Sequence, residues 1–288
     1  RRQRQMCIRD SPMAHMYGMA FEFLYEFLSG VHIYYLTRIP SPAIISQALQ
    51  EVKPIIMIAV PLVIEKIIRK KVFPKIQNNR MRILLNMPVI NKKVREKIRE
   101  QVYQAFGGNL YEIIIGGAAL NGEIESFLRH IDFPYTVGYG ATECGPIICY
   151  RDWHTFVKGS CGQAALHQEV RIDSSDPQNI PGEILTKGPN VLLGYYKNEE
   201  ATQQAIDKDG WFHTGDLGLM DSDGNVFIKG RSKNMLLGSN GQNIYPEEIE
   251  DKLNSLPLVN ECLIIQSGDK LIGLVHPCLL YTSPSPRD

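Results

Sequence analysis

The sequence predicts an α/β fold: a mostly parallel sheet with flanking helices, a β-rich subdomain, and the start of a small α+β C-terminal domain. Three observations predict it. Strand-like and helix-like segments alternate through the first half of the chain. After Pro146, short strand-like segments between glycines replace this alternation, and a helix with two more strand-like segments follows. Alternation indicates a parallel sheet, because parallel strands need a crossover connection between them.

The sequence predicts two strands and three helices between residues 31 and 106. The prolines at positions 42 and 61 each stand where a first helical turn accepts them, and the first of these helices has Ser41 as its N-cap. The apolar run at 54–60 suits a strand buried on both faces. In chain order the strand, helix, strand, helix and helix are residues 31–36, 41–52, 54–60, 61–70 and 91–106.

A strand–helix–strand unit follows, and both of its strands end in glycine-rich loops. The strand at 111–115 leads into GGAA, Asn121 starts a helix, and the strand at 135–140 leads into GYGATE. Such a unit is parallel and right-handed, so both loops lie at one edge of the sheet. Ligands of open α/β sheets bind beyond the carboxyl ends of the strands.

The second half predicts a β-rich subdomain and a short C-terminal unit. One hairpin turns at Asp223-Gly224 and another at Asn240-Gly241, both typical turn dipeptides. Pro146 precedes the change of pattern, and Pro246 opens the last helix. The expected strands are residues 168–173, 182–187, 192–196, 259–266 and 271–277, the hairpins 217–231 and 234–245, and the helices 197–206 and 246–256.

The two ends do not share the pattern of the rest. Residues 1–11 and 278–288 resemble translated sequencing adapters, so we set them aside as non-native. We therefore expect a fragment of a longer protein, with a partial large domain over 12–231 and a partial small domain over 232–277. The β-rich subdomain is expected at about 147–231.

Charge and cysteines limit the partners. The net charge is zero; residues 1–11 carry four arginines and one aspartate (+3) and residues 278–288 sum to zero, so the core carries 0 − 3 = −3. This gives no electrostatic support for nucleic acid or anionic membrane as the main partner. Peripheral membrane association and the oligomeric state stay open. The remaining cysteines, without metal-site spacing, predict reduced thiols and a cytoplasmic location; they are Cys144, Cys149, Cys161 and Cys262.

The second glycine loop carries groups suited to a nucleotide. Gly138 and Gly140 let the backbone approach a ligand, and the Thr142 hydroxyl can donate to phosphate oxygens. Glu143 only accepts, which suits Mg²⁺. In the alternative interpretation Thr142 caps a turn and the glycines relieve crowding. Two such loops on adjacent strands favour the nucleotide site. Neither G-x-G-x-x-G nor a P-loop is present, so neither a dehydrogenase nor a P-loop NTPase is supported.

Four further stretches share one resemblance. The segments at 139–143, 182–198, 210–218 and 230–250 resemble successive signatures of the adenylate-forming superfamily, and residues 12–19 (PMAHMYGM) resemble the next signature upstream. This superfamily includes acyl-CoA synthetases, adenylation domains of nonribosomal peptide synthesis and luciferases. Through PMAHMYGM and GGAALN, the chain is most similar to bacterial long-chain fatty-acid–CoA ligases.

The resemblance implies a role for each matching residue. Tyr139 would stack on adenine, Thr142 would bind phosphate, Glu143 would hold Mg²⁺, and Asp216 would accept hydrogen bonds from the ribose hydroxyls. Thr142 and Glu143, with His15 beside the acyl tunnel, are the implied catalytic residues. The implied nucleotide-binding residues are Gly117, Ala118, Ala119, Gly138, Tyr139, Gly140, Ala141, Thr142, Asp216 and Arg231.

Four assignments have plain structural alternatives. Arg231 would reach the ribose and phosphate region, or form a surface ion pair. Lys233 stands at the hinge position of the family, or is an ordinary exposed lysine. Gly241 lies in the loop that faces coenzyme A, and an Asn-Gly turn explains it equally. For His15 the alternative is a buried structural histidine.

By resemblance, the full enzyme is an acid–thiol ligase that uses ATP, Mg²⁺, a fatty acid and coenzyme A. It forms an acyl-adenylate and then a thioester. The phosphate loop upstream and the C-terminal lysine of the family have no counterpart here, so we expect this fragment to be inactive in adenylation. Two alternatives stay open: another adenylate-forming ligase, for aryl or medium-chain acids or for loading a carrier protein, and a non-catalytic nucleotide-binding module.

Overall fold

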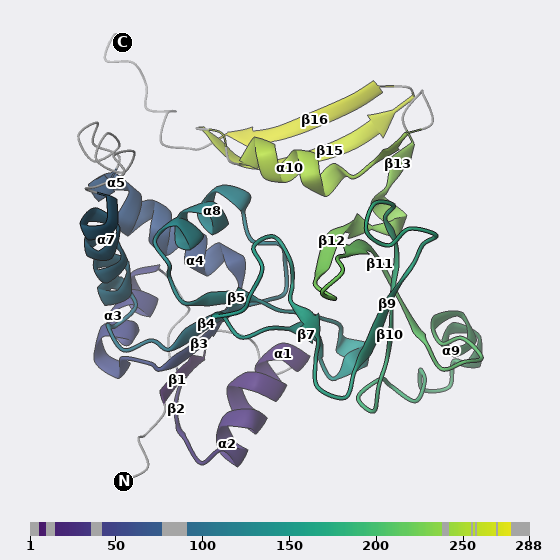
Figure 1. Cartoon of the computed structure of the whole chain (residues 1–288), viewed down its shortest axis with the longest axis horizontal. Helices are drawn as coiled ribbons and strands as arrows, with labels where there is room; N and C mark the ends of the chain where they lie inside the picture. Colours follow the sequence, from purple (N-terminus) through teal and green to yellow (C-terminus); the bar gives the residue numbers. More distant parts are fainter. Residues whose placement is uncertain are drawn as a thin grey trace, which may run out of the picture.

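A computed structural model gives the architecture. Figure 1 shows helices packed around a parallel sheet in the first half, a β-rich region beside it, and a C-terminal helix with a long hairpin across the top. The structure describes residues 6–9, 15–35, 42–76, 91–237, 242–254, 256, 258–268 and 270–277.

The parallel sheet confirms the predicted fold class. Its order is β3 (Ile56–Ala59), β4 (Glu112–Ile115) and β5 (Tyr135–Val137), and both neighbouring pairs are parallel. These short apolar strands are mostly buried, as a strand covered on both faces should be. A separate parallel pair joins β1 (Met6–Arg9) to β2 (His32–Tyr35); β1 lies inside the segment that sequence analysis set aside.

The helices begin where the sequence signals place them. α3 (Pro42–Val52) and α4 (Pro61–Ile67) each start with proline, and α7 (Asn91–Ala105) ends just before Gly107. Asn121 caps α8 (Gly122–His130), where its side-chain oxygen accepts hydrogen bonds from two backbone N–H groups of the first turn. In Figure 1, α4 and α8 cover the side of the sheet that faces the C-terminal hairpin.

Several helical segments were not predicted. The chain enters β2 through α1 (Met16–Met19), a π-helical turn η1 (Ala20–Tyr25) and α2 (Glu26–Leu28). Past α4 the helix continues as a π-helical turn η2 (Ile68–Val72) and α5 (Phe73–Ile76). The helical period alone does not distinguish these turns from a regular α-helix.

Antiparallel strands form the β-rich region. β6 (Tyr139–Gly140), β7 (Ile147–Tyr150) and β8 (Gln163–Ala164) make one sheet. The other sheet has the order β12 (Val226–Arg231), β11 (Phe212–Met220), β10 (Gly182–Lys187) and β9 (Glu169–Asp173). The hairpin predicted at Asp223-Gly224 is the β11–β12 connection. Buried side chains of both sheets form a second core, separate from the one around the parallel sheet.

One predicted strand is absent. Residues 192–196 form a loop that folds back on α9 (Glu199–Ala205). The Tyr195 amide donates to the Thr202 hydroxyl at 2.8 Å, and Asn198 caps the helix. These local bonds take the place of a sheet ladder, so the prediction was wrong for this segment.

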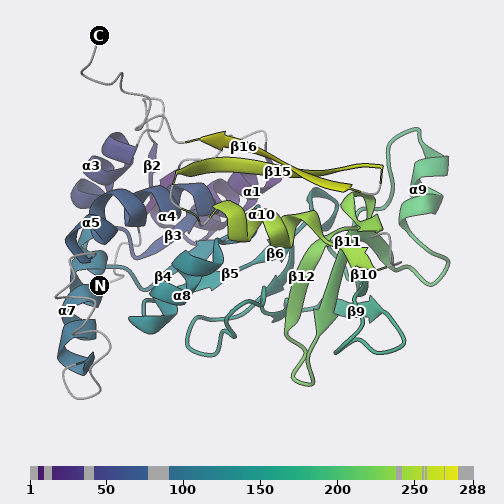
Figure 2. The same ribbon diagram turned by 90° about the horizontal axis from the view of Figure 1, so that it is seen from above.

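The described part of the chain after residue 231 consists of short strands, one α-helix and a long hairpin. It contains η4 (Ser232–Asn234), β13 (Leu236–Leu237), β14 (Asn243–Ile244), α10 (Pro246–Asn254), β15 (Val259–Ser267) and β16 (Lys270–Pro277). In both views α10 lies between the β15–β16 hairpin and α8 (Figure 2). Among the residues that the structure describes, no helix has both the length and the apolar composition needed to cross a membrane.

Candidate functional site

The two glycine-rich loops lie at one edge of the parallel sheet, as predicted. Ile115 and Val137 are paired at the ends of β4 and β5, and the Gly138 amide donates to the Ile115 carbonyl at 2.8 Å. Gly117 adopts a φ of +87°, which favours glycine. Gly117, Ala118 and Ala119 are exposed. The carboxyl end of β4 therefore presents small, open backbone.

The structure explains why glycine is needed at one position of the second loop but not at the other. A Cβ on Gly140 would overlap the Pro146 carbonyl across β6 and β7, so the fold itself requires this glycine. At Gly138 the nearest atoms lie 3.6 Å or farther from an added Cβ, and φ is ordinary. Crowding within the chain thus explains Gly140. Crowding does not require glycine at Gly138, so the predicted approach of a ligand there stays a prediction.

Three predicted residues meet in one cluster, the Tyr139–Asp216–Arg231 group. The Tyr139 hydroxyl donates to Asp216 Oδ2 at 2.6 Å, and Arg231 Nε lies 3.2 Å from Asp216 Oδ1. Asp216 and Arg231 are directly opposite each other on β11 and β12. Burial, followed by the adjacent Asp216 charge, raises the pKa of Tyr139 far above its ordinary value. The Tyr139 residue is only 8% exposed, so its predicted stacking on adenine stays a prediction.

A bulge in β11 sets the position of Asp216. The β10–β11 register shifts between Glu183 and Leu185, and Gly215 has a φ of +73°. Glu183 holds this bulge, because one carboxylate oxygen accepts from the Gly215 amide at 2.9 Å and the other lies 2.9 Å from His213 Nδ1. Sequence analysis gave neither Glu183 nor His213 a role, and their contact crosses two strands.

Glu143 lies in a short 3₁₀ turn, η3 (Thr142–Cys144), with Thr142 exposed beside it. Glu143 Oε1 accepts from the Tyr195 hydroxyl at 3.0 Å. Burial and this bond raise the pKa of Tyr195. Sequence analysis assigned no role to Tyr195, although the motif at 182–198 contains it. The contact places the loop at 192–196 beside Glu143, the predicted Mg²⁺ ligand.

His15 starts α1 and is exposed, so it is not a buried structural histidine. Its Nδ1 accepts from the Tyr17 amide at 3.2 Å. Tyr17 packs against the first glycine loop, where a Cβ on Gly116 would come within 3.0 Å of the ring. The Tyr17 hydroxyl also reaches the Ile114 carbonyl at 3.5 Å. Helix α1 therefore lies against the end of β4, a contact that sequence analysis missed.

The two remaining predicted residues lie toward the C-terminal unit. Lys233 is exposed within η4, two residues past Arg231. Gly241 lies outside the described residues, although β13 and β14 on either side form the expected antiparallel pair. Both functional assignments stay predictions.

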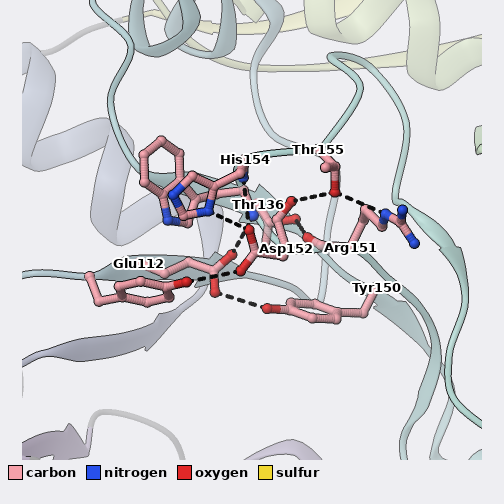
Figure 3. Close-up of polar contacts among 9 residues, drawn as sticks. Glu112, Thr136, Tyr150, Arg151, Asp152, His154 and Thr155 are labelled. Atoms are coloured by element: carbon pink, nitrogen blue, oxygen red, sulfur yellow. Dashed lines mark hydrogen bonds and ion pairs between the residues drawn. The ribbon is translucent and has the colours of Figure 1, made fainter.

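A second polar cluster occupies the amino end of β4 (Figure 3). We call Tyr111, Glu112, Tyr150, Asp152 and His154 the Glu112 cluster. Glu112 is 3% exposed and accepts from the Tyr150 hydroxyl at 2.8 Å and the Trp153 amide at 3.1 Å. Its pKa rises to about 7, chiefly because burial penalises the charged form. The Asp152 carboxylate accepts from Tyr111 and contacts His154 Nδ1 at 2.6 Å. These groups are satisfied by one another.

Comparison with known proteins identifies relatives. The family model described as AMP-binding enzyme matches residues 2–196. Long-chain-fatty-acid–CoA ligase 1 of Saccharomyces cerevisiae is 31% identical over 92% of this chain and 41% of its own length. A feruloyl-CoA synthase of Amycolatopsis sp. is 31% identical over 75% of this chain and 44% of its own length. The chain thus spans about two fifths of these relatives.

Solved structures share the fold. O-succinylbenzoate coenzyme A synthetase from Bacillus subtilis, in complex with AMP, matches with a TM-score of 0.73 and 21% identity, over 96% of this chain and 52% of that one. ATP-bound MatB from Rhodopseudomonas palustris matches with a TM-score of 0.72 and 23% identity, over 98% and 52%. At this identity the likeness shows the fold alone.

Proposed function

The chain belongs to the AMP-binding enzyme family, and on that premise we propose that the longer protein is an ATP-dependent acid–thiol ligase. It joins a long-chain fatty acid to coenzyme A through an acyl-adenylate. The observation that carries the proposal is the Tyr139–Asp216–Arg231 group, in which Tyr139 belongs to the second glycine loop and the other two residues are paired on β11 and β12.

Asp216 supplies the acceptor that a ribose needs. A carboxylate offers about four lone-pair positions, so the bonds to Tyr139 and Arg231 leave capacity for two ribose hydroxyls. The Asp216 side chain is 13% exposed, which leaves oxygen surface for a ligand. Arg231 is 71% exposed, so its ion pair is weak and its guanidinium is free to turn toward a phosphate.

Glu143 is the proposed ligand for Mg²⁺. Mg²⁺ bound with nucleotides takes one or two carboxylates and completes its shell with phosphate oxygens and water. A single carboxylate fits this pattern, and among the described residues no three His, Cys, Asp or Glu side chains converge on one point. When bound, the ion offsets the charge on the phosphates. Thr142, exposed beside it, would donate its hydroxyl to a phosphate oxygen.

Sequence similarity supports a fatty acid as the substrate. Two long-chain ligases of S. cerevisiae align over 92% and 94% of this chain, while FadD15, a long-chain ligase of Mycobacterium bovis, aligns over 64%, and the feruloyl and 4-coumarate ligases align over 75% and 65%. An aryl-acid ligase is the alternative, because the feruloyl and 4-coumarate ligases are 31% and 33% identical to this chain, as high as the 31% and 30% of the two S. cerevisiae ligases. We also propose a cytoplasmic location, which the four buried, unpaired thiols support.

Acid-dependent ATP–pyrophosphate exchange with the complete gene product tests the proposal. We expect exchange with fatty acids, rising with chain length, and little with ferulate or coumarate. The reverse order would support the aryl alternative, and no exchange with any acid would support a non-catalytic nucleotide-binding module. The 288-residue chain, assayed beside it, is expected to give none.

A further inference from the structure

Asp251 on α10 reaches across to the start of α8. Asn121 Nδ2 donates to Asp251 Oδ1 at 3.0 Å, and the Gly122 amide donates to Asp251 Oδ2 at 3.4 Å. Figures 1 and 2 both show α10 beside α8. The negative carboxylate suits a helix N-terminus, where backbone N–H groups lack partners within the helix. A residue of the C-terminal unit thus completes the cap of a helix in the parallel-sheet region.

The partner of Asp251 is the residue that ends the first glycine loop. Asn121 follows Leu120 directly after Ala119, and it is 6% exposed. Its backbone amide donates to Glu65 Oε1 at 3.1 Å, and its side-chain oxygen accepts from the Ile124 amide at 3.3 Å. Asn121 is therefore held by α4, by α8 and, through Asp251, by α10.

The Asp251 carboxylate on α10 also affects the pKa of two nearby glutamates. Glu65 has a raised pKa, first because of burial, and the Asp251 carboxylate adds to this rise while Arg69 opposes it. Burial chiefly raises the pKa of Glu125 in the first turn of α8, and the Asp251 charge adds a smaller part. Removing the Asp251 charge should therefore lower the pKa of both groups.

Other polar contacts of α10 have partners close to it in the chain. Glu248 pairs with Lys229 at 2.8 Å, and Glu247 accepts from Asn234 at 2.8 Å. By contrast, Asp251 and Asn121 are 130 positions apart. The Asp251 contact is thus one that depends on where α10 lies relative to the first half of the molecule.

We propose that Asp251 is a positioning residue, which orders the end of the Gly117–Ala119 loop through Asn121 when α10 is docked. This inference rests on the proposed function, because it takes that loop to be part of the nucleotide site. A loop that is already ordered loses less entropy when a ligand binds. Docked α10 therefore raises affinity for the nucleotide, and by linkage the nucleotide favours docking.

The test compares Asp251→Ala with Glu248→Ala, a matched control on an exposed carboxylate of the same helix. Amide hydrogen exchange of the 288-residue chain reports on the first turn of α8, and calorimetry reports AMP affinity. For Asp251→Ala we expect about 10-fold faster exchange there and about 5-fold weaker AMP binding. Asp251→Asn, which keeps one acceptor, should lie between. Glu248→Ala should change neither quantity.

Each result is decisive. Unchanged exchange in Asp251→Ala would overturn the contact itself, and faster exchange with unchanged AMP affinity would overturn the coupling. Loss of the nearby charge and loss of burial would both lower the pKa of Glu65 in an NMR titration, so circular dichroism separates the two cases: positioning leaves the spectrum unchanged, whereas general loosening alters it. If the unaltered chain bound no AMP, the nucleotide assignment and the coupling would fail together, and exchange in α8 would still decide the contact.

Discussion

The two ends of β4 and β5 use polar groups in opposite ways. At the amino end, the Glu112 carboxylate, two tyrosine hydroxyls and the Asp152–His154 pair satisfy one another. At the carboxyl end, the loop at 117–119 is exposed, Thr142 is exposed, and the Glu143 carboxylate accepts from the Tyr195 hydroxyl. A closed network contributes to stability, whereas open groups can bind a ligand. The same strands therefore separate a structural end from the end at which we propose that the nucleotide binds.

The largest effect is expected when Asp216, beside the second glycine loop, is substituted. In the complete protein, Asp216→Ala should weaken AMP binding by roughly 1,000-fold, or about 4 kcal/mol, because two hydrogen bonds to a charged acceptor contribute about 1.5–3 kcal/mol each. Calorimetric titration with AMP measures this loss.

The matched control is Glu112→Gln at the opposite end of the sheet. It should leave AMP affinity within about 2-fold, because the Glu112 cluster contributes nothing to the nucleotide edge. Comparable losses in both variants would show that the two ends are not separate in function.

The free energy of unfolding should depend on pH through the Glu112 cluster. The pKa of Glu112 rises from 4.5 to about 7 in the folded chain. Because the unfolded state ionises first, stability from this group is complete below pH 4.5, falls as pH rises, and is lost by about pH 7. The shift corresponds to about 3 kcal/mol. The Gln side chain in Glu112→Gln cannot ionise. Between pH 4.5 and pH 7 the free energy of unfolding of this variant should therefore fall by about 3 kcal/mol less than that of the unaltered protein.

Urea unfolding of the two proteins at pH 4.5 and pH 7.5 measures the difference. Other carboxylates titrate in the same window, so the relevant quantity is the variant's free energy of unfolding minus that of the unaltered protein. A difference that does not change with pH would mean that Glu112 stays charged in the fold.

Local signals predicted much of this arrangement. Pro42 and Pro61 placed two helix starts, and Asn121 placed a third. Each of these residues acts on backbone a few positions away, so a single sequence contains the information. The common edge of the two glycine loops followed from the parallel direction of their strands.

The contacts between distant side chains could not be predicted. Tyr139 and Asp216 were both named, but for stacking and for ribose binding; their mutual bond spans 77 positions and depends on how two sheets pack. Glu112 interrupts an apolar run and gave no signal, because its partner Tyr150 lies 38 positions away. The loop at 192–196 was taken for a strand, since its apolar pattern did not reveal the bond from Tyr195 to Thr202.

The smallest effect on the free energy of unfolding is expected from loss of a single hydrogen bond between β5 and the residues next to the Glu112 cluster. Thr136 is fully buried, and its hydroxyl donates to the Arg151 carbonyl at 2.7 Å (Figure 3). Thr136→Val keeps the shape and leaves that carbonyl unpaired, so unfolding should become about 1 kcal/mol easier. Thr155→Val is the control: its exposed hydroxyl accepts from Arg151 Nε at 2.9 Å, and its loss should cost less than about 0.5 kcal/mol. A lower urea midpoint at constant slope measures both. Equal losses would mean that burial does not strengthen this network, and the contrast between the two ends would then rest on Glu112 alone.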